Sequence, residues 1–351
     1  MLIDIGAQLN IWRVITVANL RGQDVANRVI PGVGHLISAF IVLGGIAFNI
    51  GNIGGAGLAM NVIFGVPPVI GSLIAAVLII GIFLLRNAKG VMDSVMQVLG
   101  LVMLCMIGYA MLQSSPPLLE AMSRSFNPDD PLILLLPIVT LVGGTVGGYI
   151  SFSGGHRLVE AGITGVENVR LVTRAAVIGI ATTGVVRICL FLAALGVVSQ
   201  GLTLDPSNPA ASVFSHSMGT IGYKIFGVVL LAASVSSVIG AAYTSVTFMY
   251  SLHDSIRRHN QRVVIAFIAC STLIYSLVGQ PVKVLVVAGT LNALVLPLAL
   301  GCILLASRKS NIVGDAYRHP TWMLMFGILA MLATAVGVVM SFNALLEFWQ
   351  A

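Results

Sequence analysis

The chain has 351 residues, of which 58% are hydrophobic and only 9% are charged. Soluble domains carry about 25% charged residues, so a soluble protein of this size would lack the charges needed to cover its surface. The composition therefore excludes a cytosolic enzyme, a nucleic-acid-binding protein and a disordered chain. It predicts an all-α protein that crosses a lipid bilayer several times.

Apolar runs of membrane-spanning length recur along the whole chain. A spanning helix needs about 20 mostly apolar residues, and this criterion predicts about ten helices. Their ranges are 1–20, 33–64, 67–85, 93–113, 132–155, 171–199, 219–252, 262–279, 283–306 and 321–347. The loops between them are short, so we expect residues 1–351 to form a single transmembrane domain.

The basic residues are distributed unevenly between the two sets of alternating loops. One set contains Arg21, Arg28, Arg86, Lys89, Arg157, Arg170, Arg174, Arg257, Arg258, Arg262, Arg308, Lys309 and Arg318, whereas the other contains Arg124, Lys224 and Lys283. Cytoplasmic loops of membrane proteins carry an excess of Lys and Arg. We therefore expect the first set to lie in the cytoplasm and the protein to lie in the inner (plasma) membrane.

The first segment, residues 1–20, is a poor spanning helix by itself. Only about 12 residues, or about 18 Å of helix, precede Arg13, whereas the hydrocarbon core is about 30 Å thick. The segment also contains Asp4, Gln8 and Asn10. We expect it to need a partner that covers its polar face, and one more helix upstream would supply that partner.

Charged residues inside apolar runs are functional candidates by default. Arg187 lies in the middle of the run TTGVVRICLFL, and Asp4 is the only acid that we place inside the membrane. An unpaired cation at this depth would cost several kcal/mol. We therefore hypothesise that Arg187 pairs with Asp4 along the translocation path.

The stretch TLVGGTVGGYISFSGG, residues 140–155, is unusually rich in glycine. It contains Gly143, Gly144, Gly147, Gly148, Gly154 and Gly155, and each glycine inside a helix costs about 1 kcal/mol relative to Ala. We predict a helix that breaks in mid-membrane, where non-helical backbone is tolerated if it lines a cavity or is buried in protein. Freed carbonyls at such breaks bind cations in transporters. The alternative is close helix packing through small residues.

Polar side chains flank the predicted break. Tyr149, Ser151 and Ser153 supply hydroxyl groups beside it, so we group them with Gly143, Gly144, Gly147 and Gly148 as candidate substrate- or ion-binding residues. His156 follows the last glycine pair. We interpret His156 as a residue of the inner mouth, with an ordinary loop histidine as the alternative.

Two further stretches carry polar residues within apolar runs. Asn49 and Asn52 are three residues apart and share a helix face, so they either line the translocation path or form an interhelical hydrogen bond worth about 1 kcal/mol. The hydroxyl-rich stretch 232–247 is interpreted as a packing surface, with weak coordination of an ion as the alternative. Asn292 and Pro297 mark a kink in a later helix.

Known catalytic and cofactor motifs are absent from the sequence. There is no HExxH, P-loop or Rossmann fingerprint, and no Ser-His-Asp constellation. We therefore predict a carrier and no enzyme, without a cofactor. Its expected partners are a transported ion or small solute and the lipid bilayer, with no nucleic acid.

Three stretches resemble the Nramp divalent-metal transporters, which are proton-coupled carriers. They are Arg21-Gly22-Gln23-Asp24-Val25-Ala26, GLAMNVIFGVP at 57–67, and FGVVLLAASVSSVIGAAYTSVTFM at 226–249. The second is similar to the end of that family's third helix and the third to its eighth. The ten predicted segments fit helices two to eleven of the family. The resemblance implies a LeuT-type inverted-repeat bundle and transport of a divalent metal cation.

The sequence departs from the family pattern at its most characteristic positions. The Asp-Pro-Gly-Asn break of the family's first helix is absent, and the Met-Pro-His of its sixth helix aligns with Gly147-Gly148-Tyr149. Two acids implicated in proton movement align with Asn49 and Asn52. The metal ligands, metal selectivity and proton coupling therefore stay open. The alternatives are a carrier of the same fold for an amino acid or organic acid, and a non-transporting membrane subunit or truncated remnant.

Overall fold

Helices form every element of the computed structural model, which describes residues 1–85, 88–251 and 254–350; no strand occurs in that part of the chain. Each predicted segment coincides with a helix or a helix pair. The long helices are α1 (Leu2–Ala18), α3 (Val33–Phe64), α4 (Pro68–Leu84), α5 (Ala88–Gln113), α7 (Leu135–Val146) with α8 (Gly148–Glu160), α9 (Val169–Ser199), α10 (Pro209–Phe248), α12 (Asn260–Val278), α13 (Pro281–Ala306) and α15 (Thr321–Gln350). Arg86 and the last residue of the predicted segment 219–252 lie outside the described residues.

The predicted number of spanning helices is roughly met. Within the described residues, seven spans are long and apolar enough to cross a membrane, with α7 and α8 counted together, or eight if α5 and the helix after it form one bent span. Helices α1 and α4 have 17 residues each, one fewer than the 18 needed to count as such a span. The fold is therefore a polytopic helical membrane bundle.

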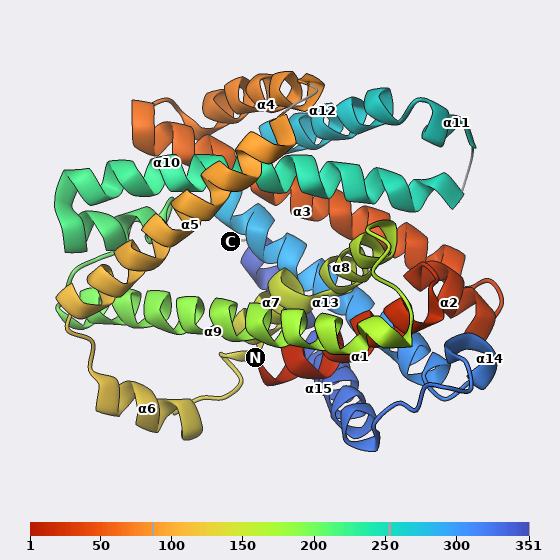
Figure 1. The fold of residues 1–351 in the computed structure, drawn as a ribbon. Coiled ribbons are helices and arrows are strands. Elements are labelled where there is room, and N and C mark those ends of the chain that lie inside the picture. The colour runs from red at the N-terminus through yellow and green to blue at the C-terminus, as the bar shows by residue number, and fades with distance from the viewer. Residues whose placement is uncertain (86–87, 252–253, 351) are drawn as a thin grey trace.

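Short helices mark the two ends of this bundle. Helices α2 (Gly22–Val29), α11 (Asp254–Arg258) and α14 (Ser310–Val313) lie at the right-hand end in Figure 1, and the basic residues Arg21, Arg257 and Arg308 lie in or next to them in the chain. Helix α6 (Leu118–Phe126) lies at the opposite end, apart from the other helices. This grouping agrees with the sidedness expected from the loop charges.

Helix α3 is the central element of the bundle and packs against α10, α13 and α4. Its partner α10 contains a break at Gly219, whose positive φ of 64° suits glycine. The predicted span began at this residue, and the helical residues before it, from Pro209, were not expected to be helical. The break thus separates a short outer piece from the part of α10 that packs on α3.

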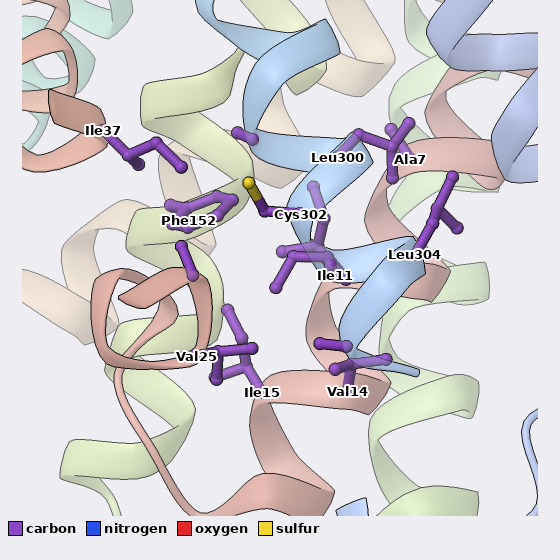
Figure 2. Packing of buried hydrophobic residues seen from close by; sticks show 14 of the residues in the cluster. Ala7, Ile11, Val14, Ile15, Val25, Ile37, Phe152, Leu300, Cys302 and Leu304 are labelled. Atoms are coloured by element: carbon purple, nitrogen blue, oxygen red, sulfur yellow. The ribbon is translucent and has the colours of Figure 1, made fainter. Parts of the chain in front are cut away.

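The largest apolar cluster lies at the end of the bundle that carries α2 and α14. Figure 2 shows Ile11 of α1 close to Cys302 of α13, with Phe152 of α8 beside them, and Ile15 of α1 next to Val25 of α2. Phe152 is fully buried. This packing encloses α8, the inner half of the broken helix, on several sides.

Candidate functional site

The predicted helix break lies at Gly147, between α7 and α8. Gly147 has φ −47° and ψ 158°, which is extended backbone, and it is the last residue before α8 begins. It is about 18 Å along the chain from Leu135 and about 20 Å from Glu160, at 1.5 Å per helical residue. The prediction of an interruption within residues 143–148, halfway along a spanning segment, is confirmed.

Side chains of the neighbouring elements complete the break. The Ser151 hydroxyl donates to the Val146 carbonyl oxygen at 2.7 Å, and the Trp12 indole N–H donates to the Ser151 carbonyl oxygen at 3.0 Å. Both bonds satisfy polar groups that water cannot reach. The fold therefore pairs these polar groups at the break with partners of its own.

The glycines around the break also serve the alternative role, close packing. A Cβ at position 143 would collide with the Gly289 carbonyl of α13, and one at position 147 would lie 2.7 Å from the Asn292 Cβ atom. Gly148 faces Val295 in the same way. Gly144 differs, because it is exposed and no atom lies within 4 Å of its Cβ position. The glycine-rich stretch therefore both interrupts the helix and packs closely against α13.

The three hydroxyl groups beside the break have different roles. Ser151 and Ser153 donate to carbonyl oxygens of their own chain segment, those of Val146 and Tyr149. Tyr149 is buried and reaches across to α10, where its hydroxyl donates to the Ala241 carbonyl oxygen at 3.2 Å. Of the three, Tyr149 alone connects the broken helix to another element.

Four helices meet around Tyr149. A Cβ at position 45 of α3 would lie 3.0 Å from the Tyr149 ring and against the Ser245 hydroxyl of α10. At position 44, Asn292 of α13 donates its amide to the backbone carbonyl oxygen at 3.5 Å. Asn49 lies one helical turn beyond Gly45 on the same face of α3. We call Asn49, Tyr149, Ser245 and Asn292 the central polar cluster.

Several amide atoms of this cluster have no hydrogen-bond partner. Asn49 is fully buried and both of its amide atoms are unpaired, and so is the Asn292 oxygen; outside the cluster, the Asn52 nitrogen is unpaired as well. The large majority of buried polar groups in proteins are paired, and each unpaired one costs about 1–3 kcal/mol. Asn49 forms no interhelical hydrogen bond, so that interpretation of it was wrong. The cluster has the chemistry of a site that binds a polar ligand.

The predicted partner of Arg187 is present. The Arg187 guanidinium lies 3.3 Å from an Asp4 carboxylate oxygen, and the Thr145 hydroxyl donates to the other oxygen at 3.2 Å. Thr145 lies two residues before the break. The ion pair therefore joins α1 and α9 to the end of α7.

His156 is a buried residue of α8, so the loop alternative was wrong. Its Nε2 atom lies 2.9 Å from the Thr247 hydroxyl and 3.1 Å from a Glu160 carboxylate oxygen. The next residue, Arg157, donates to the Thr244 hydroxyl and to the Gly240 carbonyl oxygen at 3.2 Å and 3.1 Å. These contacts fasten the inner half of the broken helix to α10.

A second polar group, which the sequence did not predict, lies where α1 meets the loop before α15. Arg13 donates to the Tyr317 hydroxyl at 3.2 Å, Tyr317 donates to His319 at 2.9 Å, and His319 donates to the Asn10 oxygen at 2.7 Å. We call these residues the inner polar cluster. Burial and the nearby Arg13 charge lower the pKa of His319 to about 4. The cluster explains how Arg13 is accommodated in an apolar run.

Within the ranges that the structure describes, no three His, Cys, Asp or Glu side chains are grouped so that they could hold a metal ion. The central polar cluster contributes neutral oxygen and amide groups instead. Sequence reasoning had assigned Asn292 to a kink and Ser245 to packing. The available signal for Asn292 was an amide within an apolar run, the same signal that singled out Asn49.

Comparisons with known proteins agree on one family. The sequence profile described as "Natural resistance-associated macrophage protein-like" (Nramp) matches residues 22–344. The chain is 50% identical over 350 residues to uncharacterized membrane protein YcsG of Bacillus subtilis, covering 99% of this chain and 86% of that protein. It is 49% identical over 338 residues to an uncharacterized membrane protein of Haemophilus influenzae, covering 96% and 84%.

Solved structures with the same fold come from a manganese transporter of Eremococcus coleocola. Its complex with an aromatic bis-isothiourea substituted compound is 17% identical with a TM-score of 0.69, covering 98% of this chain and 78% of that one. A mutant of the transporter gives 14% identity and a TM-score of 0.70, covering 99% and 80%. At this identity the likeness concerns the fold.

Proposed function

The chain belongs to the Nramp family and shares its LeuT-type fold, and from this premise we propose that it is a secondary transporter of the plasma (inner) membrane whose substrate passes the central polar cluster. The observation that carries the proposal is the helix break at Gly147 beside Asn292, whose amide oxygen is unpaired, together with the buried, unpaired amide of Asn49 on helix α3. Transporters of this kind bind their substrates at such breaks near the bilayer midplane.

In this proposal the residues have separate roles. Asn49, Tyr149 and Asn292 contact the substrate, and the Gly143–Gly148 segment gives it access to backbone groups. Asp4 and Arg187 lie beside the outer half of the path, and His156 beside the inner half. The arrangement supports these roles because the ion pair contacts α7 and the histidine contacts the inner part of α10.

We propose a divalent metal cation as the first candidate substrate. Family membership supports it, and the neighbour with a solved structure is named a manganese transporter. Hard cations accept amide, hydroxyl and carbonyl oxygens as ligands, which is the donor set of the central polar cluster. Proton coupling would need groups other than Asn49 and Asn52, because amides do not titrate at physiological pH.

A small organic solute, such as an amino acid or organic acid, is the second candidate. The observation that favours it is that the central polar cluster is neutral and offers unpaired donors as well as acceptors. A bare divalent cation leaves amide donors unused, and its burial without a nearby carboxylate costs free energy. A solute with its own donors and acceptors would satisfy both kinds of atom.

Transport by the purified protein in liposomes distinguishes the candidates. We expect uptake of either Mn²⁺ or Mg²⁺, or of a labelled amino acid or organic acid, with matching heat of binding by calorimetry. Uptake by the cluster variant Asn49→Leu is compared with uptake by the control Asn61→Ala. Asn61 is the control because its amide donates to the Val66 carbonyl oxygen outside the cluster. Flux of neither class would instead support a non-transporting subunit.

A further inference from the structure

Helix α6 is a nine-residue helix, and none of its residues is buried. Its apolar side chains are Leu118, Leu119, Met122 and Phe126, and Leu119 and Phe126 are 88% and 86% exposed. At 100° per residue these four fall within an arc of about 100°. The helix therefore has one continuous apolar face that no other part of the described chain covers.

The opposite face of α6 is charged. Glu120 and Arg124 lie there, 4.0 Å apart, and Arg124 also pairs with Asp129 in the following turn. Exposed ion pairs of this kind are stable in water and unfavourable among acyl chains. The charged face of the helix thus suits water, and the apolar face suits acyl chains.

A sharp turn separates α6 from α5. The two helices meet at 102°, after Pro116 and Pro117. Helix α6 therefore does not continue the direction of α5, and it lies away from the end of the bundle that carries α2, α11 and α14 (Figure 1). Helix α5 also has exposed apolar side chains, which include Leu101 and Leu112.

We propose that α6 is an interfacial helix of the outer leaflet, with its apolar face among the lipid acyl chains and Glu120 and Arg124 in water. Amphipathic helices that lie in this plane have this division of faces. A second protein copy is a poorer occupant, because four side chains fall short of the roughly 800 Å² per partner of a stable interface. By this placement α6 fixes the depth of the segment that leads to α7.

Spin-label accessibility tests the proposal on the full chain in phosphatidylcholine–phosphatidylglycerol liposomes. The native cysteines, Cys105, Cys189, Cys270 and Cys302, are replaced by Ala, and single cysteines are introduced by Leu119→Cys and Phe126→Cys. The matched controls on the charged face are Glu120→Cys and Arg124→Cys. Collision rates with oxygen, which enters the bilayer, and with a water-soluble nickel chelate are compared.

We expect the oxygen-to-nickel ratio to be several-fold higher at positions 119 and 126 than at 120 and 124. Equal, high nickel accessibility at all four positions would place α6 in water and overturn the proposal. Low accessibility to both reagents at 119 and 126 would mean that protein covers the face, and would overturn it as well. If the cysteine-free chain fails to fold, brominated-lipid quenching of Leu119→Trp against Glu120→Trp in the native sequence gives the same decision.

Discussion

The inner and central polar clusters are both buried in helical packing, but only one of them is complete. Around His319, each ring nitrogen has a partner, and Asn10 also donates to the carbonyl oxygens of Gly6 and Met323. Around Tyr149, both amide atoms of Asn49 and the oxygen of Asn292 have none. A complete cluster stabilises the fold, whereas an incomplete one costs free energy that binding of a ligand recovers.

The largest expected effect is on stability, from breaking the inner polar cluster. Asn10→Leu removes the acceptor of the His319 ring N–H and leaves that N–H buried without this partner. At about 1–3 kcal/mol for an unpaired buried group, we expect a loss of about 1–3 kcal/mol in the free energy of unfolding. Thermal unfolding in detergent, followed by size-exclusion chromatography, measures it, and an unchanged midpoint would contradict the assignment of this cluster to stability.

Replacement of Asn by Leu in the central polar cluster should reduce transport and leave stability intact. Asn49→Leu removes a buried amide that has no partner, so we expect stability to stay equal or to rise by about 1 kcal/mol. Substrate uptake in liposomes should fall about tenfold for each lost hydrogen bond to the substrate. A variant that unfolds as easily as Asn10→Leu while transporting normally would reverse the comparison.

A smaller effect on stability is expected from removing the Asp4–Arg187 ion pair beside the helix break. Asp4 is buried, whereas the Arg187 side chain is 39% exposed. Solvent screening therefore limits the pair to about 1 kcal/mol of coupling. A double-mutant cycle of Asp4→Asn and Arg187→Gln measures it, because the double variant should be less destabilised than the sum of the single variants. Strict additivity would show that the pair contributes nothing.

The sequence predicted the fold better than it predicted the site. Span positions follow from apolar run lengths, and the break at Gly147 follows from glycine density, because both depend on local free energies. The Asp4–Arg187 pair followed from the cost of an isolated charge in the membrane. For the spans and the break one chain segment contained enough information, whereas the pair required two charged residues to be matched across the chain.

The polar clusters depend on contacts between segments far apart in the chain. Asn292 is a single amide in an apolar run, and nothing local indicates that it meets the backbone of α3 at Gly44 beside Tyr149. His319 lies next to Arg318 in a loop whose sequence predicts exposure to solvent. It is nevertheless buried, where it forms a hydrogen bond with Asn10 of α1. Such pairings require the packed arrangement of the helices.

The pH dependence of stability separates the clusters once more, because only the inner one contains a titrating group with a shifted pKa outside the spanning helices. The pKa of His319 is about 4 in the folded protein and 6.5 when unperturbed, so between these values the unfolded chain binds more protons. Stability must therefore rise with pH across this window and fall on acidification, by at most about tenfold in the unfolding equilibrium per pH unit. The groups that face the ring are Arg13, Tyr317 and Arg308, and the two arginines stay charged throughout. Unfolding midpoints at pH 7.5 and pH 5 should differ less in His319→Gln than in the unsubstituted protein. If the midpoint changes equally with pH in both proteins, the pKa of His319 is the same in the folded and unfolded states.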